Sequence, residues 1–374
     1  MWETVKLGDV CTIKTGKKDV NEGNSKGEYP FFTCAKEHTY SDGYSFDCEA
    51  ILIAGNGAVG QTTYYQGKFE AYQRTYLLSD FHSILPKLLL FILQGRLMNH
   101  LSSMVLGNTI PYIKKGMLQN FEFLLPPLAE QQRIVAKLDA AFAEIDGAIE
   151  AVEQTTLQSF QLYQNELSKT FKNIDEREPR RTLKDVAKVF GRGKSKHRPR
   201  NDERLYGDKI PFIQTGNVSK AKMYVDSFDK GYSQLGISQS KIWDKGTVCI
   251  TIAANIAELA ILDMDACFPD SVIGVYPDKE ITSSEYIFYL LSFFQIYIKS
   301  KSKGSAQQNI NLATFEFEKF PFPSKLSSQN LIVDKLNELQ KKLGLYQSLQ
   351  SEKLHEMRNL KSSVLAQELQ SEAA

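Results

Sequence analysis

Two long stretches of the chain carry apolar residues at helical spacing. In the first, apolar or aromatic side chains recur mostly every three or four residues from Ile134 to Leu167, after the pair Pro126-Pro127. Such steps keep side chains on one face of an α-helix. Prolines suit a helix entrance because the first N–H groups have no intrahelical partner. The pattern predicts a long helix over residues 126–172, in which about 43 helical residues would span roughly 64 Å at about 1.5 Å per residue.

The second stretch, residues 324–374, repeats this pattern and its entrance. Ile134-Val135-Ala136-Lys137-Leu138 is echoed by Ile332-Val333-Asp334-Lys335-Leu336, and a glycine falls in the middle of each predicted helix, at Gly147 and Gly344. An apolar stripe of this length needs a partner to cover it. We therefore expect the two helices to pack against each other as an antiparallel coiled coil.

The duplication extends to the regions that precede the helices, residues 1–125 and 173–323, which are rich in short β-like runs with turn signals. Residues 176–179 are the expected linker between the repeats. The sequence predicts an α+β fold in which tandem, duplicated, β-rich α/β domains are joined by the two long antiparallel helices, with pseudo-twofold symmetry. The echoes are Leu7–Val10 with Leu183–Val186, Gly16-Lys17 with Gly193-Lys194, Tyr29–Phe32 with Ile210–Ile213, and Ala50–Ala54 with Thr247–Thr251.

Composition indicates a folded, soluble protein. The chain has 374 residues, 42% hydrophobic and 24% charged, with a formal net charge of +1. No run reaches the 18 or so uninterrupted apolar residues of a membrane span, and the N-terminus lacks a signal-peptide layout. The five cysteines are irregularly spaced, which argues against a disulfide framework or a zinc site. These features predict a cytoplasmic protein.

Charge is unevenly distributed between the two repeats. Residues 1–125 carry 12 basic and 12 acidic residues, whereas residues 179–323 carry 21 basic and 16 acidic residues. Nine of these bases lie within 180–200, where Asp185 is the one acid. The loop Gly191–Arg200 suits contact with phosphates, although a basic loop can also be a solvated surface. Lys299, Lys301 and Lys303 form a second basic run.

The segment Gly55-Asn56-Gly57-Ala58-Val59-Gly60 matches the glycine fingerprint of dinucleotide-binding sites, but its surroundings argue against that function. The fingerprint requires a helix to follow. Here the next residues, 61–67, are β-prone and contain a glycine, so we expect a tight turn between strands. No phosphate-binding Walker loop or adenine-methylase tetrapeptide is present, and the five histidines have no ligand spacing. The sequence predicts a non-catalytic chain without its own cofactor or metal.

With the entrance Pro126-Pro127-Leu128-Ala129-Glu130-Gln131-Gln132 after a β-rich region, the chain resembles the specificity subunit of type I restriction–modification systems. The opening, Trp2 to Val10, also resembles that family, and the resemblance covers nearly the whole chain. The second entrance departs from the motif: with Ser328-Gln329-Asn330 it is interpreted as having lost the Glu-Gln pair.

The resemblance implies that each β-rich region is a target recognition domain for one half of a bipartite double-stranded DNA sequence. It also implies that the helices set the spacing and bind two modification (methyltransferase) subunits. Adenine methylation would use S-adenosylmethionine held by those partners, and cleavage would require a restriction subunit with ATP and Mg. All the chemistry would lie in the partner subunits.

We expect each domain to contact phosphates and to read base edges in the major groove through polar loop residues. The candidates in the first domain are Lys17, Lys18, Lys36, Asn56, Gln61, Arg74, Asn108 and Thr109; those in the second are Arg192, Lys194, Lys196, Arg198, Gln214, Asn217, Asn255, Ser305, Gln307, Gln308 and Asn309.

Two alternatives stay open at this point. One is a coiled-coil adaptor whose β-rich domains bind proteins, which the near-neutral first domain favours. The other is an enzyme with a nucleotide site at residues 55–60. Salt-dependent binding to duplex DNA would favour the specificity subunit over both.

Overall fold

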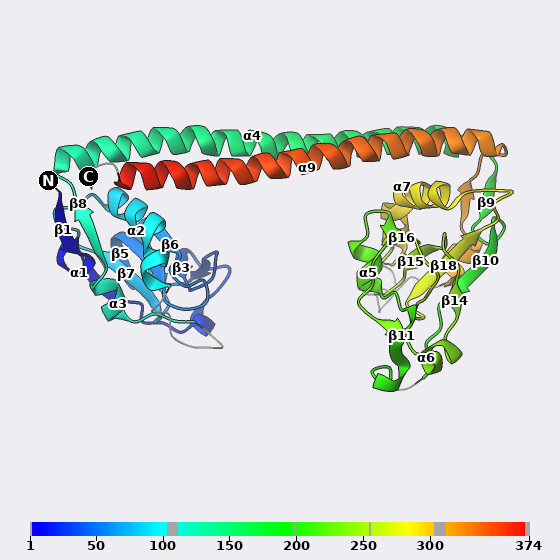
Figure 1. Ribbon diagram of the computed structural model, residues 1–374, viewed down its shortest axis with the longest axis horizontal. Helices are drawn as coiled ribbons and strands as arrows, with labels where there is room; N and C mark the ends of the chain where they lie inside the picture. Colours follow the sequence, from blue (N-terminus) through cyan, green and yellow to red (C-terminus); the bar gives the residue numbers. More distant parts are fainter. Residues whose placement is uncertain (1, 103–110, 198, 254–255, 303–311, 371–374) are drawn as a thin grey trace. The chain divides into compact units, whose positions relative to one another are not determined.

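The computed structural model describes residues 2–102, 111–197, 199–253, 256–302 and 312–370. The chain divides into two compact units. Unit 1 comprises residues 1–154 and 350–374, and unit 2 comprises residues 155–349. The predicted long helices are present as α4 (Leu128–Asp175) and α9 (Leu326–Gln370), and each contributes one half to each unit (Figure 1).

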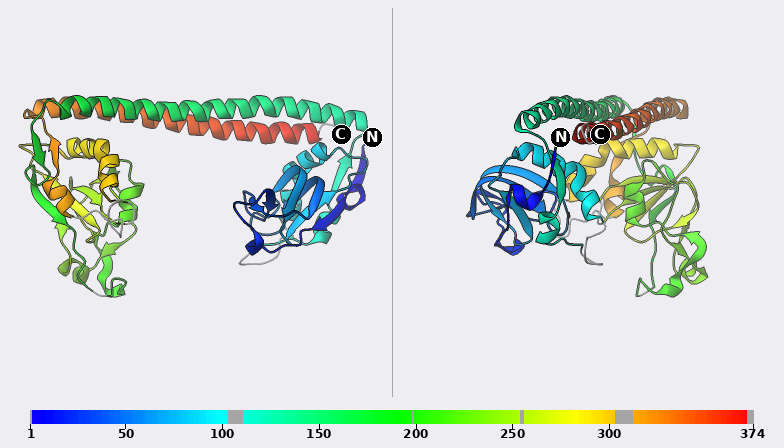
Figure 2. Two further views of the ribbon diagram at one scale, coloured as in Figure 1. Left: turned by 180° about the vertical axis from the view of Figure 1, so that it is seen from behind. Right: turned by 60° about the vertical axis from the view of Figure 1, so that its left-hand side comes forward.

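Unit 1 is built on a six-stranded sheet in the order β2-β7-β5-β6-β3-β4, in which β3 runs parallel to β6 and the other neighbours are antiparallel. The helix α2 (Pro86–Leu101) lies between this sheet and the long helices (Figure 2). The strands are β2 (Thr12–Thr15), β3 (Tyr29–Phe32), β4 (Thr39–Ser41), β5 (Phe46–Ala54), β6 (Thr62–Ala71) and β7 (Thr75–Ser79). Beside them lie the pair β1 (Glu3–Lys6) and β8 (Glu122–Leu125), and the short helices α1 (Leu7–Val10), η1 (Val20–Glu22) and α3 (Lys115–Gln119).

Unit 2 contains a five-stranded sheet in the order β10-β18-β15-β16-β12, with α7 (Ser284–Ser302) in the place that α2 occupies in unit 1. Its strands are β10 (Ala187–Arg192), β12 (Tyr224–Val225), β15 (Val248–Thr251), β16 (Leu259–Leu262) and β18 (Val272–Pro277). Three two-stranded ladders accompany it: β9 (Arg180–Thr182) with β19 (Lys319–Pro321), β11 (Tyr206–Pro211) with β13 (Gly231–Tyr232), and β14 (Ile242–Trp243) with β17 (Ala266–Cys267). The short helices are η2 (Glu203–Leu205), α5 (Thr215–Lys220), α6 (Gln234–Ser238) and α8 (Leu312–Phe317).

The central strands of the two units pair in the same register, which confirms the predicted duplication. Adding 197 to each number in the pairs Ile51–Leu78, Ile51–Tyr64 and Ile53–Tyr76 gives the pairs Val248–Val275, Val248–Ile261 and Ile250–Ile273. The N-terminal echo is matched in its bonding as well, since Asp9 accepts from the backbone N–H of Lys6 as Asp185 accepts from that of Thr182. The same central strand framework is therefore present in both units.

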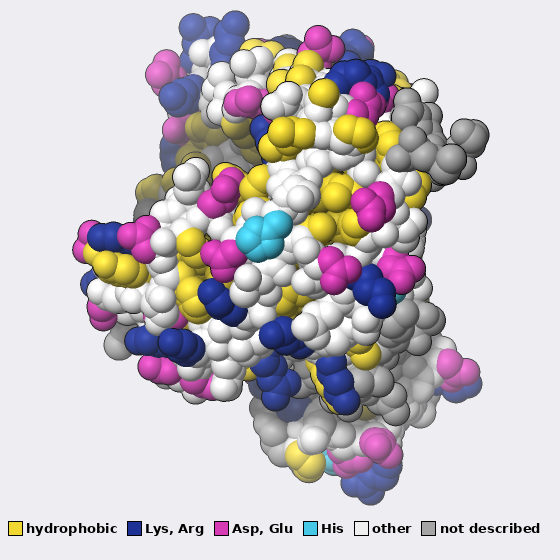
Figure 3. Space-filling model, turned by 90° about the vertical axis from the view of Figure 1, so that its left-hand side faces the viewer, with side chains coloured by type: hydrophobic (Ala, Val, Ile, Leu, Met, Phe, Trp, Pro, Cys, Tyr) yellow, Lys and Arg dark blue, Asp and Glu magenta, His cyan; other side chains and the backbone are white. Residues whose placement is uncertain are grey.

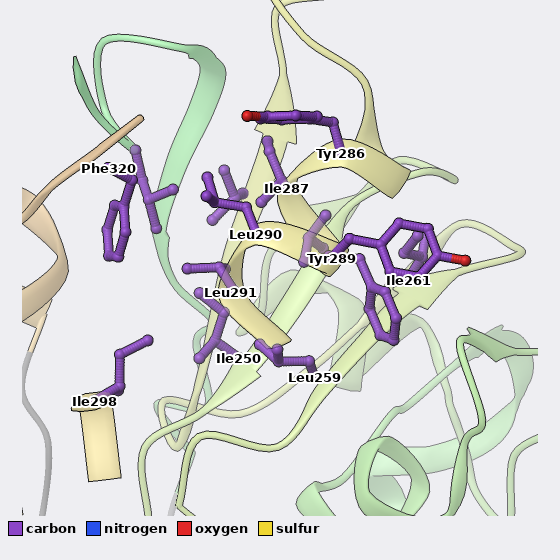
Figure 4. Packing of buried hydrophobic residues seen from close by; sticks show 14 of the residues in the cluster. Ile250, Leu259, Ile261, Tyr286, Ile287, Tyr289, Leu290, Leu291, Ile298 and Phe320 are labelled. Atoms are coloured by element: carbon purple, nitrogen blue, oxygen red, sulfur yellow. The ribbon is translucent and has the colours of Figure 1, made fainter. Parts of the chain in front are cut away.

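The largest hydrophobic core of each unit joins the sheet, the helix α2 or α7, and the long helices of the same unit. In unit 2, Ile250 and Ile261 of the sheet pack in one cluster with Leu290 and Leu291 of α7 (Figure 4). Leu336 of α9 belongs to the same cluster and is fully buried. The corresponding core of unit 1 takes Ile134, Leu138 and Phe142 from α4 and Leu365 and Leu369 from α9. Burial of these apolar stripes stabilises helices of this length.

Ion pairs between the helices establish their relative direction. In unit 1, Lys137 pairs with Glu368 at 2.5 Å and Asp146 pairs with Lys361 at 2.7 Å. In unit 2, Glu166 pairs with Lys335. Since the partner's number falls along α9 as the residue number rises along α4, the pairing is antiparallel, as predicted. Apart from the buried Glu368, these side chains are partly or largely exposed. Ion pairs with exposed side chains contribute little stability, so apolar packing holds the helices together.

The five cysteines are free thiols. Within the described part of the chain, none of the helices combines the length and the apolar character that a membrane span requires.

Candidate nucleic-acid interface

Four loops meet at one end of the sheet in unit 1 and are tied together through the backbone. The N–H of Gly55 donates to the carbonyl of Arg74 at 3.0 Å, and the N–H of Gln73 donates to that of Lys18 at 2.9 Å. The Gln61 side chain donates from its Nε2 to the carbonyl of Lys36 at 2.9 Å. The structure therefore brings together the predicted residues Lys17, Lys18, Lys36, Asn56, Gln61 and Arg74 on neighbouring loops.

The two Gly-Lys pairs occupy equivalent places in the two units. A Cβ atom on Gly16 would lie 2.1 Å from the carbonyl oxygen of Ala71, and one on Gly193 would lie 2.1 Å from that of Phe268. Only glycine permits so close an approach of the backbone. The next residue then donates its N–H to the same carbonyl, Lys17 at 3.2 Å and Lys194 at 3.1 Å. The Lys17 and Lys194 side chains are both exposed.

The glycine segment 55–60 is a turn between two antiparallel strands, as expected. The N–H of Gly60 donates to the carbonyl of Ala54 at 2.9 Å, and Gly57 and Gly60 have φ angles of +60° and +78°. Strand β6 follows directly, in place of the helix that a dinucleotide site requires. In unit 2 the turn is closed in the same way by Ala257, whose N–H donates to the carbonyl of Thr251.

The face of the sheet beside these loops is open in unit 1 and covered in unit 2. A cavity of about 440 Å³ in unit 1 lies over Leu52, Thr63 and Thr75. The equivalent residues in unit 2, which stand 197 positions later, are Cys249, Ala260 and Val272. They pack in one cluster with the buried Val218 of α5. The cavity rim in unit 1 includes side chains that can stack or hydrogen-bond with a base: Lys36, Glu37, His38, Tyr40 and Gln61.

The basic loop of unit 2 is held at several points. Ser240 donates its hydroxyl to the carbonyl of Lys194 at 2.8 Å, and Gln239 accepts from the N–H of His197 at 3.0 Å. Hydrogen bonds from the Arg204 side chain and backbone, and then from the His197 ring, hold the pKa of Asp202 below its usual range. Lys194 and Lys196 stay exposed on this loop.

The other predicted residues of unit 2 differ in their exposure and in whether their side chains already bond to other residues of the protein. Arg192 on β10 and Gln214 before α5 are exposed. Asn217 is half-buried, and it accepts from the N–H of Gln214 and donates to Asp229. Lys299 pairs with Glu258 at 2.9 Å. The predicted positions Asn108, Thr109, Arg198, Asn255, Ser305, Gln307, Gln308 and Asn309 lie outside the described residues, as does Lys303.

The electrostatic surface of unit 1 is mixed. On the face shown in Figure 3, Lys and Arg side chains are interspersed with Asp and Glu, in keeping with the balanced composition of residues 1–125. Among the residues that the structure describes, no group of three or more His, Cys, Asp or Glu side chains is placed to hold a metal ion.

Sequence reasoning missed the buried glutamines at the two helix entrances. Gln131 and Gln329 are each 1% exposed. Gln131 bonds to the segment just before α2, and Gln329 bonds to the segment just before α7. The interpretation that the second entrance lost the Glu-Gln pair was therefore wrong for the glutamine, since Gln329 stands where Gln131 stands and Ser328 replaces Glu130. The aligned runs from Ile134 and Ile332 already imply this match.

Comparison with known proteins identifies the family. A family model described as a type I restriction modification DNA specificity domain matches residues 1–154 and again residues 178–353. The chain belongs to the type I restriction–modification DNA specificity family. The double match agrees with the duplicated strand framework, so the chain is a specificity subunit with two recognition domains, as the resemblance implied.

Individual relatives support this assignment. The chain is 39% identical over 153 residues to the type I restriction enzyme EcoDI specificity subunit of Escherichia coli, a match that covers 41% of this chain and 34% of that protein. The chain thus matches about a third of that relative's length. It is also 25% identical over 329 residues to a putative type I restriction enzyme specificity subunit of Haemophilus influenzae, covering 84% of this chain and 80% of the other.

Solved structures share the fold. A chain from a study of complex assembly and conformational transition in a type I restriction–modification system superposes with a TM-score of 0.74 at 17% identity, covering 98% of this chain and 97% of that one. The HsdS subunit from Thermoanaerobacter tengcongensis gives 0.53 at 17% identity, with 98% and 96% covered.

Proposed function

We propose that this specificity subunit directs a type I restriction–modification complex to a bipartite double-stranded DNA target, with each recognition domain reading one half. The observation that carries this proposal is the strand register repeated at an offset of 197 residues beneath dissimilar loops. A constant framework with different loops suits two domains that hold DNA alike and read different bases.

Within each domain, phosphate contacts and base contacts fall to different residues. Lys17 and Lys194 lie at equivalent places on their backbones and suit phosphate contacts, which are indifferent to sequence. Gln61 and Asn56 lie on the loop beside the open cavity of unit 1, whereas α5 covers the equivalent sheet face in unit 2. We assign base reading to such non-equivalent features, because amide side chains discriminate bases in the major groove.

The long helices would set the spacing between the half-sites. A helix of 48 residues, α4, measures roughly 72 Å at about 1.5 Å per residue, and α9 has 45 residues. Half-sites on one face of B-DNA repeat every 34–36 Å or so. A stiff helix pair of this length can fix a spacing of that order, which a flexible linker cannot do.

The helices would also bind two modification subunits. Leu331, Leu345 and Leu349 of α9 lie within about 40° of one another around the helix, at 100° per residue, and they are 72%, 65% and 55% exposed. The buried Val333 and Leu336 face the opposite side. An exposed apolar row on a helix whose other face is already packed suits a helical partner.

Catalysis would reside in the partners. Modification subunits would use S-adenosylmethionine to methylate adenine, and restriction subunits would use ATP and Mg to cleave unmodified DNA in the cytoplasm. This chain would supply recognition, spacing and assembly, and would need no cofactor of its own.

The test is adenine methylation across a genome after co-expression of the cognate modification subunit with and without this chain. A bipartite methylated motif that appears only when both are present supports the proposal. A stable complex that produces no methylated motif and shows no salt-dependent DNA binding would overturn the proposal and favour a protein-binding adaptor.

The modular part of the proposal has its own test. Replacing residues 1–125 with another recognition domain of the family should change one half of the methylated motif and leave the other half intact. A change in both halves, or in neither, would contradict the assignment of one half-site to each domain.

A further inference from the structure

The entrance of each long helix contains a buried glutamine whose amide is fully engaged with the recognition domain of the same unit. In unit 1, the Gln131 Nε2 donates to the carbonyls of Ser83 and Pro126 at 2.8 and 2.9 Å, and its Oε1 accepts from the N–H of Leu85 at 2.8 Å. Ser83 and Leu85 directly precede α2, so one amide ties the start of α4 to the start of α2.

Unit 2 repeats this arrangement with one change of donor. The Gln329 Nε2 donates to the carbonyls of Ile281 and Pro323 at 2.9 and 2.8 Å. Its Oε1 accepts from the hydroxyl of Thr282 at 2.7 Å, where Gln131 accepts from a backbone N–H. We call Gln131 with its three partners, and Gln329 with its three, the glutamine joints.

The bonding pattern of a glutamine joint requires a primary amide. Two carbonyl oxygens need two N–H donors from one nitrogen, and a donor beside them needs an adjacent acceptor. A glutamate of the same size would direct a carboxylate oxygen at two carbonyl oxygens and provide no donor. Both glutamine side chains are excluded from water, so an unmatched group there is not compensated by solvent.

The joints lie where a recognition domain meets its long helix. In unit 1, α2 packs against β5 and β6 on one side, and on the other it contacts α4 through Lys87 and Asp139. The loop residues assigned to DNA contact project from that same sheet. The orientation of the loops with respect to α4 therefore depends on how firmly α2 is held to the entrance of α4.

We propose that Gln131 and Gln329 are positioning residues that fix the orientation of each recognition domain on its long helix, and thereby the accuracy of the spacing between the half-sites. This inference rests on the proposed function. The helices can set a spacing only if the joint at each entrance is stiff. Loosening one joint then relaxes the spacing while the bases read by each domain stay the same.

The local part of the proposal is tested by hydrogen exchange on the full-length chain. Gln131→Glu and Gln131→Met should increase exchange at least tenfold at the Leu85 amide, while the amides of β5 and β7 keep their protection. Gln132→Glu is the matched control, because Gln132 is the exposed neighbour. Unchanged exchange at Leu85 in both variants would overturn the joint itself, whatever the function of the protein.

The functional part is tested by methylation of a DNA library with both half-sites and spacers of varied length. In complexes carrying Gln131→Glu or Gln329→Glu, preference for the best spacer over spacers one base pair longer or shorter should fall at least fivefold, with half-site bases unchanged. Gln132→Glu and Asn330→Asp serve as exposed controls. Wild-type spacer preference in variants whose joint is loosened would refute the positioning role.

The two proposals fail in distinguishable ways. Absence of methylation by the wild-type complex counts against the proposed function, whereas hydrogen exchange still decides whether the joints exist. Should one variant fail to assemble, the variant in the other unit provides the same measurement. Failure of all glutamine variants to assemble, with both controls active, would contradict a role confined to positioning.

Discussion

Replacing Leu345 and Leu349 together by alanine tests whether the outward face of α9 is a docking surface. Full burial of a leucine side chain stabilises by about 1.5–3 kcal/mol. The two residues expose 65% and 55% of their surface, and alanine keeps the Cβ atom, so the affinity loss should be about 2 kcal/mol. That loss corresponds to a roughly 30-fold higher Kd for the modification subunit.

The stability of the free chain should barely change in this double variant. Both side chains are largely in water, and alanine is a slightly better helix former than leucine. Leu336→Ala provides the contrast, because Leu336 is fully buried in the core of unit 2. Its replacement should cost about 2–5 kcal/mol of unfolding free energy through lost burial and the remaining cavity.

The assay combines a titration of the variant with the modification subunit and a thermal melt of the free chain. We expect weaker binding with an unchanged melt for Leu345→Ala with Leu349→Ala, and a lowered melt for Leu336→Ala. A Kd within threefold of the wild type in the folded double variant would refute the assignment of this face.

Three further outcomes are expected. Gly193→Ala should destabilise unit 2 by about 1–3 kcal/mol in a melt, because its Cβ would meet the Phe268 carbonyl, whereas Gly216→Ala, in open space within α5, should be neutral or stabilising. Lys17→Ala and Lys194→Ala should each reduce the salt dependence of DNA binding by about one ion, and an unchanged slope would exclude that lysine from phosphate contact. The pKa of Asp202 is lowered in the fold, so the ionised carboxylate stabilises the fold above about pH 4, and this stabilisation is lost as pH falls through the folded pKa. Hydrogen exchange near Asp202, corrected for intrinsic rates, should therefore rise in acid. The variant Asp202→Asn should remove that pH dependence.

The sequence predicted the elements whose signals are long or repeated. Helical spacing over some forty residues located α4 and α9 to within a few residues, because an apolar stripe of that length and period is typical of a long packed helix. The short echoes at Gly16 and Gly193 were recognisable because close backbone approach demands glycine in both units. The segment 55–60 was correctly predicted to be a turn between strands, because the residues that follow it are β-prone.

Other features have no signal within a single segment. The bonds of Gln131 join positions 46 and 48 residues apart, and a buried glutamine is indistinguishable in sequence from the exposed Gln132 beside it. The cavity of unit 1 is open because the loop that follows β3 is shorter than its counterpart in unit 2 and contains no helix equivalent to α5. This difference can be recognised only when the two sheets are compared in register. The DNA-contact residues stay predictions, since loop polarity does not tell bases from phosphates.

The pairing of α4 with the end of α9 has a consequence for the order in which the protein matures during synthesis. Ile134 and Leu365 belong to one core, yet they leave the ribosome 231 residues apart. At 5–20 residues per second, roughly 12–46 s separate them. Unit 2, formed by the continuous segment 155–349, has no such wait. The first recognition domain to emerge is thus the last to be completed, and a chain that stops early leaves Gly95 of α2 without Leu365 and Leu369, an apolar surface that quality control can detect.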